Sequence, residues 1–322
     1  MAFTSTDGVG GAKQQMTVTR FVSLVLKGAA MGAANVIPGV SGGTIALITG
    51  IYEDLIGTLN SFGWNAGKLF FKADFRKCFD HLNGPFACAV GVGVLASVFS
   101  AAKVIGHLLN QHETLTMAFF FGLILASIFL VGRQVPKWKP LAGVALLAGV
   151  AVAAAILLIK PLTENPDPLY IFLCGIAAMC SMLLPGISGS FILILMGNYA
   201  LLLDATSNVQ DYRKSLPILL PFTAGCAVGL LGFARVLSFI LDRFKATTLA
   251  MLTGFVAGSL AVIWPWKTTL TKTISGKTAV TGYQWNLPEL NKPLLLAVLI
   301  MLAGAGLVLL LDKLAGNHKT RK

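Results

Sequence analysis

Two short runs of proline, glycine and serine interrupt long apolar stretches of this chain and could bind an anion. The first run is Pro38-Gly39-Val40-Ser41-Gly42-Gly43, and the second, 147 positions later, is Pro185-Gly186-Ile187-Ser188-Gly189-Ser190. Proline ends a helix and serine can cap the helix that follows, so each run predicts a broken helix. The start of a returning helix presents N–H groups and partial positive charge, which suit a phosphate.

Backbone that has lost its hydrogen bonds is costly in lipid, so a break of this kind survives where it lines a cavity or a ligand site. Because the break occurs twice, we expect both loops to form one substrate site. Tight turns that only allow close helix packing are the alternative. The expected substrate-binding residues in and beside the loops are Asn35, Pro38, Gly39, Ser41, Gly42, Gly43, Thr44, Pro185, Gly186, Ser188, Gly189 and Ser190.

Five charged residues near the loops are further candidates. Lys27 and Arg235 lie in apolar segments, where each could pair with a phosphate or extend to the membrane interface. The carboxylates that follow the predicted hairpins, Glu53, Asp54 and Asp204, are candidates for proton coupling, with solvated helix ends as the alternative. The five cysteines lack metal-ligand spacing, so we expect no metal site and no cofactor.

Composition places the chain in a membrane. Hydrophobic residues make up 56% and charged residues 12%, with a mean hydropathy of +0.78, whereas a soluble domain carries about 25% charged residues. We predict an all-α polytopic transmembrane protein, because the alternating segments of about 10 residues typical of a β-barrel are not visible. The net charge of +12 fits helix ends that meet anionic lipid, and no nucleic-acid motif accompanies it.

Eight apolar units divide the chain into two repeats. We expect a polar N-terminus at 1–20, a first repeat at 21–160, a second at 169–312 and a basic tail at 313–322. Each repeat would hold one re-entrant helical hairpin and three transmembrane helices. The expected bounds are 21–59, 85–109, 115–132 and 140–160 in the first repeat, and 169–203, 216–241, 247–266 and 293–312 in the second.

The distribution of basic residues favours hairpins over spanning helices for the first unit of each repeat. With hairpins and a cytoplasmic N-terminus, 15 of the 25 lysines and arginines lie inside and 7 outside, in agreement with the positive-inside rule. Three spanning helices are an odd number, so the second repeat would enter the membrane inverted. Matches at the 147-residue offset, such as Gly50 with Gly197 and Tyr52 with Tyr199, support the duplication.

The motifs resemble those of a known bacterial family, the polyprenyl-phosphate translocases. The resemblance rests on Asn35-Val36-Ile37-Pro38-Gly39-Val40-Ser41-Gly42-Gly43-Thr44 and on Leu184-Pro185-Gly186-Ile187-Ser188-Gly189-Ser190-Phe191. It implies a flippase of the bacterial cytoplasmic membrane, and the distribution of basic residues predicts that both termini are cytoplasmic. The implied partner is the lipid carrier undecaprenyl phosphate, which is returned from the outer to the cytoplasmic leaflet for cell-wall synthesis.

Two other functions compete with this expectation. A transporter of a small soluble anion would use the same loops. A membrane lipid phosphatase would need a nucleophile with acid–base or metal partners, but the four histidines lie outside the motifs, so we expect no enzyme. Coupling to a proton or sodium gradient stays open, as does the oligomeric state.

Overall fold

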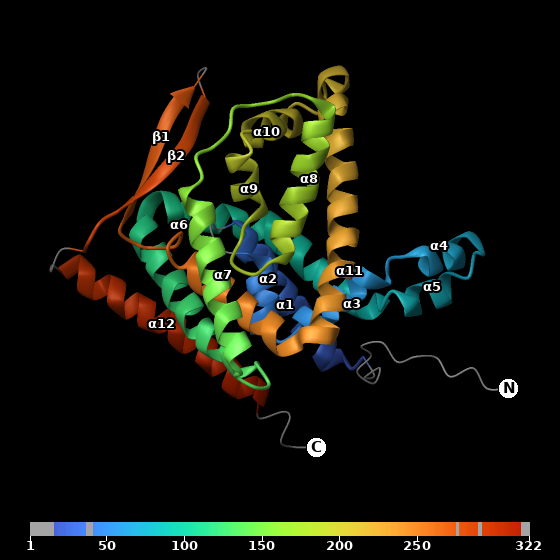
Figure 1. Ribbon diagram of the computed structural model, residues 1–322, viewed down its shortest axis with the longest axis horizontal. Helices are drawn as coiled ribbons and strands as arrows, with labels where there is room; N and C mark the ends of the chain where they lie inside the picture. The colour runs from blue at the N-terminus through green and yellow to red at the C-terminus, as the bar shows by residue number, and fades with distance from the viewer. Residues whose placement is uncertain (1–15, 37–40, 275–276, 289–291, 317–322) are drawn as a thin grey trace.

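The computed structural model shows a bundle of helices with one β-hairpin at its edge (Figure 1). It describes residues 16–36, 41–274, 277–288 and 292–316. The strands β1 (Lys267–Ile274) and β2 (Lys277–Trp285) pair antiparallel. The helices are α1 (Val18–Val36), α2 (Gly42–Ile48), α3 (Tyr52–Ser61), α4 (Trp64–Phe71), α5 (Phe75–His81), α6 (Gly84–Arg133), α7 (Pro140–Leu158), α8 (Pro168–Leu183), α9 (Gly189–Leu195), α10 (Tyr199–Ser207), α11 (Tyr212–Ser259) and α12 (Lys292–Gly316).

The length and surface of these helices suit a bilayer. Among the described residues, four helices are long and apolar enough to cross a membrane, or six if each of two bent helix pairs is one span. Large apolar side chains point outward on the long helices, for example Leu147 on α7 and Leu302 on α12. Such exposure is costly in water and favourable in lipid. The expected class, an all-α polytopic membrane protein, is therefore confirmed.

The spanning helices differ from the expected bounds because two predicted loops are kinks. The expected pairs 85–109 with 115–132, and 216–241 with 247–266, are each present as two helices that meet directly at a kink, within α6 and α11. Only His112 and Phe244 leave the helical conformation inside them. No proline or glycine stands at either place, and one non-helical residue is enough to end one helix and redirect the chain into the next.

Residues 60–84 and 260–292 also differ from the expected loops. The helix expected to end at 266 ends at Ser259 in a series of turns, and the segment beyond it forms β1 and β2. Alternating threonines at Thr269, Thr271 and Thr273 favour a strand, which the division into apolar units did not predict. The short helices α4 and α5 project from the bundle on the right of Figure 1.

Packing repeats between the two halves of the chain. Helix α1 packs along α6, and α8 packs along α11 in the corresponding place. The kinks correspond as well: the Thr116 hydroxyl donates to the Leu108 carbonyl (3.3 Å) and the Thr248 hydroxyl to the Ile240 carbonyl (3.4 Å). Both contacts satisfy a carbonyl next to the kink, which lowers the cost of the break.

The last helix of each half packs on the opposite half. Helix α12 packs on α6, and α7 packs on α11. Glycines allow backbone contact at both places: a Cβ on Gly122 would lie 1.8 Å from the Met301 carbonyl oxygen, and one on Gly254 2.2 Å from that of Leu146. The two halves are thereby locked into one unit, with the broken helices between them.

The two returning hairpins contact different parts of α11. Helix α3 contacts the middle of α11 through Asn60 and Ser238, and its kink through Glu53 and Lys245. Helix α10 lies beside the start of α11, at the top of Figure 1. The inverted relation itself, and the repeat boundaries 21–160 and 169–312, stay predictions.

Candidate functional site

The two broken-helix loops meet inside the bundle, although more than 140 residues separate them in the sequence. The Gly186 amide donates to the Thr44 hydroxyl at 2.8 Å, and the Ser41 hydroxyl donates to the Met182 carbonyl at 3.2 Å. The Tyr52 hydroxyl donates to the Leu183 carbonyl at 2.8 Å. We call the segment 41–44 the first loop and the segment 184–190 the second loop.

The first loop is closed by its own hydrogen bonds. Helix α1 ends at Val36, and Pro38 and Gly39 lie outside the described residues. Ser41 caps α2 as expected, since its side chain accepts from the Gly43 amide (3.1 Å). The Gly42 amide donates to the Asn35 side-chain oxygen at 2.7 Å. These amides were expected to be available to an anion, but Ser41 and Asn35 already occupy them.

Burial also keeps the first loop from contacting an anion. Ser41 is 1% exposed and Thr44 is 0% exposed. A Cβ added to Gly43 would lie 3.2 Å from the carbonyl oxygens of Met182 and Leu183. The described residues of the first loop therefore pack directly on the end of α8 in this conformation.

The second loop is more open. Helix α8 ends at Leu183, and Gly186 turns the chain with a φ of +84°, a conformation that favours glycine. Ser188 is the N-cap of α9 in an extended conformation, but its side chain makes no cap hydrogen bond. Its hydroxyl instead lies 2.8 Å from that of Ser190.

The helix start beyond Ser188 retains hydrogen-bonding capacity. Within the described part of the chain, the amides of Gly189 and Ser190 donate no hydrogen bond. Ser190 is exposed, and Gly189 is half-buried. The second loop therefore keeps the amides and hydroxyls that an anion would need.

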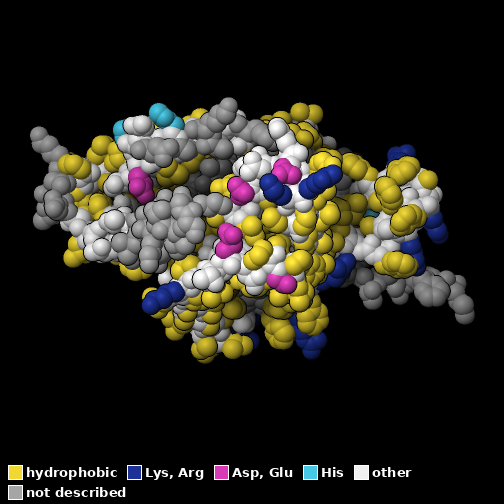
Figure 2. Space-filling model, turned by 90° about the horizontal axis from the view of Figure 1, so that it is seen from above, with side chains coloured by type: hydrophobic (Ala, Val, Ile, Leu, Met, Phe, Trp, Pro, Cys, Tyr) yellow, Lys and Arg dark blue, Asp and Glu magenta, His cyan; other side chains and the backbone are white. Residues whose placement is uncertain are grey.

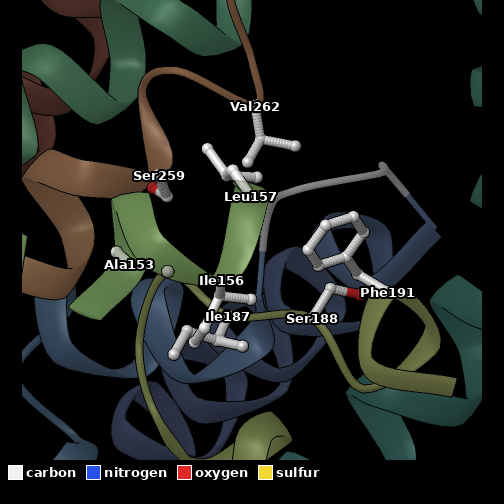
Figure 3. A pocket seen from close by; sticks show the side chains of 9 residues that line it. Ala153, Ile156, Leu157, Ile187, Ser188, Phe191, Ser259 and Val262 are labelled. Atoms are coloured by element: carbon white, nitrogen blue, oxygen red, sulfur yellow. The ribbon is translucent and has the colours of Figure 1, made fainter. Parts of the chain in front are cut away.

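A cavity lies against the second loop (Figure 3). Ser188 and Phe191 reach it from the loop and α9, and Ser259 and Val262 from the end of α11. Side chains of α7, such as Ile156, form the third wall. The volume is about 20 Å³, which is room for roughly one water. A phosphate group would require these walls to separate.

The two predicted cations contact the ends of the hairpin helices rather than the loops. Lys27 donates to the Thr49 carbonyl at the end of α2 (2.7 Å). Arg235 is exposed and donates to the Phe62 carbonyl after α3 (2.8 Å) and to that of Leu231 (3.4 Å). Both interactions satisfy carbonyls at helix ends. A phosphate contact for either residue stays a prediction.

The candidate coupling carboxylates lie outside the loops too. Glu53 forms an ion pair with Lys245 across the two halves, at 2.8 Å. Asp204 accepts a hydrogen bond from the Asn208 side chain (3.2 Å), and Asp54 is exposed. Their role in coupling stays a prediction. Over the described ranges, no three His, Cys, Asp or Glu side chains group as metal ligands.

Sequence reasoning missed how two residues join the loops. Tyr52 was noted only as half of a repeat match with Tyr199, and Thr44 was expected to bind substrate rather than to contact the second loop. Their hydroxyls bridge to Leu183 and Gly186. The signal available was the position of both residues within the duplicated motif, but a motif does not reveal which distant backbone group it meets.

Comparison with known proteins identifies the family. The model of the VCA0040-like family, described as undecaprenyl phosphate translocase-like, matches residues 31–281. The chain belongs to this family. It is 41% identical over 304 residues to a polyprenyl-phosphate transporter of Vibrio cholerae serotype O1 (strain ATCC 39315 / El Tor Inaba N16961), covering 92% of this chain and 97% of that relative.

A second relative lies further away. The chain is 33% identical over 256 residues to a polyprenyl-phosphate transporter of Staphylococcus aureus (strain NCTC 8325 / PS 47), covering 75% of this chain and 85% of that relative. No solved structure matches the chain. The resemblance inferred from the two motifs is confirmed, and the relatives are named as transporters rather than enzymes.

Proposed function

We propose that this chain is a polyprenyl-phosphate flippase of the bacterial cytoplasmic membrane, with both termini cytoplasmic. It would return undecaprenyl phosphate from the outer to the cytoplasmic leaflet. The family match and the names of both relatives support the substrate class. The multi-pass helical bundle supports a membrane location.

The observation that carries the proposal is the junction of the two loops inside an apolar bundle. Ser41 and Thr44 of the first loop contact Met182 and Gly186 at the second break. Two interrupted helices that meet at their breaks place polar backbone inside the bundle, where it can receive a charged head group. The polyprenyl tail would remain in lipid while the phosphate crosses.

The phosphate would first meet the second loop, because this loop lines the cavity and keeps available donors. Ser188 and Ser190 would contribute hydroxyls, and the start of α9 would contribute amides. The cavity must widen before a phosphate fits. Release would require the first loop to separate from α8 and expose its own donors toward the cytoplasm.

The contacts of α3 support alternating access between these two conditions. Glu53–Lys245, Asn60–Ser238 and Phe62–Arg235 hold the first hairpin against α11. Helix α10 occupies the corresponding place in the second half, but it packs on α9 and the start of α11. We infer that the route past α3 is closed in this conformation. In the alternate state, α3 would leave α11 and open this route, and α10 would close the route on the opposite side.

A leaflet-accessibility assay of labelled undecaprenyl phosphate in reconstituted vesicles tests the function. We expect the wild type to equilibrate the label between leaflets and Ser188→Ala to slow this at least several-fold, because a donor to the phosphate is lost. Ser100→Ala is the matched control, since the Ser100 hydroxyl faces outward on α6 and bonds only within its own helix (Ala96 carbonyl, 2.7 Å). No translocation by the wild type, with or without imposed proton and sodium gradients, would contradict the proposal.

The same assay separates the competing functions. Inorganic phosphate in excess should leave lipid translocation unchanged if the substrate is a lipid phosphate. Strong competition would indicate a transporter of a small soluble anion. Release of inorganic phosphate from the lipid would indicate a phosphatase.

A further inference from the structure

The helices α4 and α5 form an arm, residues 64–81, that stands apart from the bundle (Figure 1). The two helices pack on each other through buried Ala66 and Cys78, whose thiol lies 3.6 Å from the Ala66 carbonyl oxygen. The arm follows α3 and leads into α6. Nothing in the proposed transport route uses it.

Aromatic side chains cover the outside of this arm. Trp64 is 78% exposed, Phe71 is 89% exposed and Phe75 is 61% exposed. Phe70 and Phe79 are exposed as well. The lipid-facing surface of a spanning helix such as α7 is aliphatic instead. Exposed aromatic residues are typical of the interface between membrane and water, where an apolar ring meets polar head groups.

Basic residues stand among these aromatic rings. Lys68, Lys72, Arg76 and Lys77 are exposed on the arm, and Figure 2 shows dark-blue and yellow side chains together on its right-hand lobe. The Lys68 ammonium lies 5.5 Å from the centre of the Trp64 ring.

Two carboxylates of the arm, Asp74 and Asp80, only partly offset these charges. Asp74 pairs with Lys77 at 2.7 Å, and this hydrogen bond raises the pKa of Lys77. Lys68, Lys72 and Arg76 remain as cations on the surface. The arm is therefore apolar and positive at once, the combination that binds an anionic lipid surface.

The angle between α5 and α6 gives the orientation of the arm. The axis of α5 makes an angle of 72° with that of residues 84–98, which form the apolar first part of α6. If that part crosses the bilayer, α5 runs nearly along the membrane surface. The charges of the arm exclude it from the hydrocarbon core, and its aromatic rings disfavour water.

We propose that the arm lies in the head-group layer and binds anionic phospholipids. Trp64 and the phenylalanines insert at the level of the glycerol groups, and Lys68, Lys72 and Arg76 contact lipid phosphates. The arm joins the bundle at Phe62, and Arg235 donates a hydrogen bond to the Phe62 carbonyl. Lipid binding by the arm therefore fixes the end of α3. This inference does not depend on the identity of the transported lipid.

Tryptophan quenching in reconstituted vesicles tests the position of the arm. The fluorescence of the wild type minus that of Trp64→Phe reports on Trp64 alone. In vesicles of equal parts phosphatidylcholine and phosphatidylglycerol, we expect this signal to be quenched by brominated lipid and protected from aqueous acrylamide. Accessibility to acrylamide equal to that in detergent would overturn the proposal and point to a protein partner.

Charge removal tests the lipid preference. In the wild type, brominated phosphatidylglycerol should quench Trp64 roughly two-fold more than brominated phosphatidylcholine, because each cation near an anionic surface contributes about 1 kcal/mol. The triple variant K68Q/K72Q/R76Q should bring this ratio to about one, as should high salt. Trp285 on β2, measured by its own difference with Trp285→Phe, is the control that should not change. A ratio that the triple variant leaves unchanged would refute anionic lipid binding.

Discussion

The two loops carry nearly the same motif, but the structure uses them differently. In the first loop, Asn35 and Ser41 occupy the amides of Gly42 and Gly43. In the second loop, Ser188 makes no cap bond and lines a cavity. The first loop therefore stabilises the junction in this conformation, and the second offers binding groups.

This difference is the one that the proposed alternating access requires. If the two loops face opposite sides of the membrane, they cannot both be open without creating a leak, so each conformation must hold the two loops differently. The helices differ in the same way. Helix α3 packs on α11, and among the described residues α10 has no packing of similar extent. The following predictions test this difference, from the largest expected effect to the smallest.

The largest effect is expected at Gly186 of the second loop. Gly186→Ala would hold alanine at a φ of +84° with its Cβ 2.5 Å from the Phe255 carbonyl oxygen. We expect the free energy of unfolding to fall by about 3 kcal/mol or more, measured as the melting temperature in detergent.

Two other glycines calibrate that result. The Cβ added by Gly43→Ala lies 3.2 Å from two carbonyl oxygens, so this change should lower the free energy of unfolding by less. Gly57→Ala on α3 has no atom within 4 Å of the added Cβ and should be neutral or slightly stabilising. A normal melting temperature for Gly186→Ala would show that the second loop is not held as described.

The next prediction separates stability from transport. Asn35→Ala removes the acceptor of the Gly42 amide, which is buried, and should lower the free energy of unfolding by about 1–3 kcal/mol. Ser188→Ala should change the free energy of unfolding by less than about 0.5 kcal/mol, yet it should slow translocation more than Asn35→Ala does. Melting and leaflet assays on the same preparations measure both.

The exposed Asn65→Ala on α4 is the matched control for the loss of an asparagine side chain. It should alter neither stability nor translocation. Equal losses of stability for Asn35→Ala and Ser188→Ala would contradict the view that the first loop stabilises the junction and the second binds substrate.

A small effect on stability is also expected at the ion pair between α3 and α11. Glu53→Gln breaks a half-exposed pair and should cost at most about 1 kcal/mol. If this pair helps to close the α3 side, the same energy shifts the balance of states up to about five-fold. Labelling of Phe191→Cys at the cavity by a membrane-impermeant maleimide should slow accordingly.

A charge exchange provides the control for this pair. The double variant E53K/K245E should restore the labelling rate toward that of Phe191→Cys alone. If Glu53→Gln leaves labelling unchanged, α3 is not part of the gate.

Much of the site could be predicted from sequence because its elements are local. Proline and glycine position the breaks, so α1 ends at Val36 and α8 at Leu183. Ser41 caps α2 through a bond two residues away. Local rules also found the breaks near His112 and Phe244, where polar residues suggested loops and the structure has a kink between two helices. They missed the β-hairpin and the helices of the arm.

The sequence by itself determined that this is a membrane protein with two matched helix breaks, because hydrophobicity and helix-breaking residues act within a few positions. The tertiary structure decided which loop is closed. That outcome depends on Thr44 meeting Gly186 and on Tyr52 meeting Leu183, contacts between residues more than 130 positions apart. A buried donor takes whatever acceptor the fold brings to it, and neither partner is marked by its neighbours in the chain.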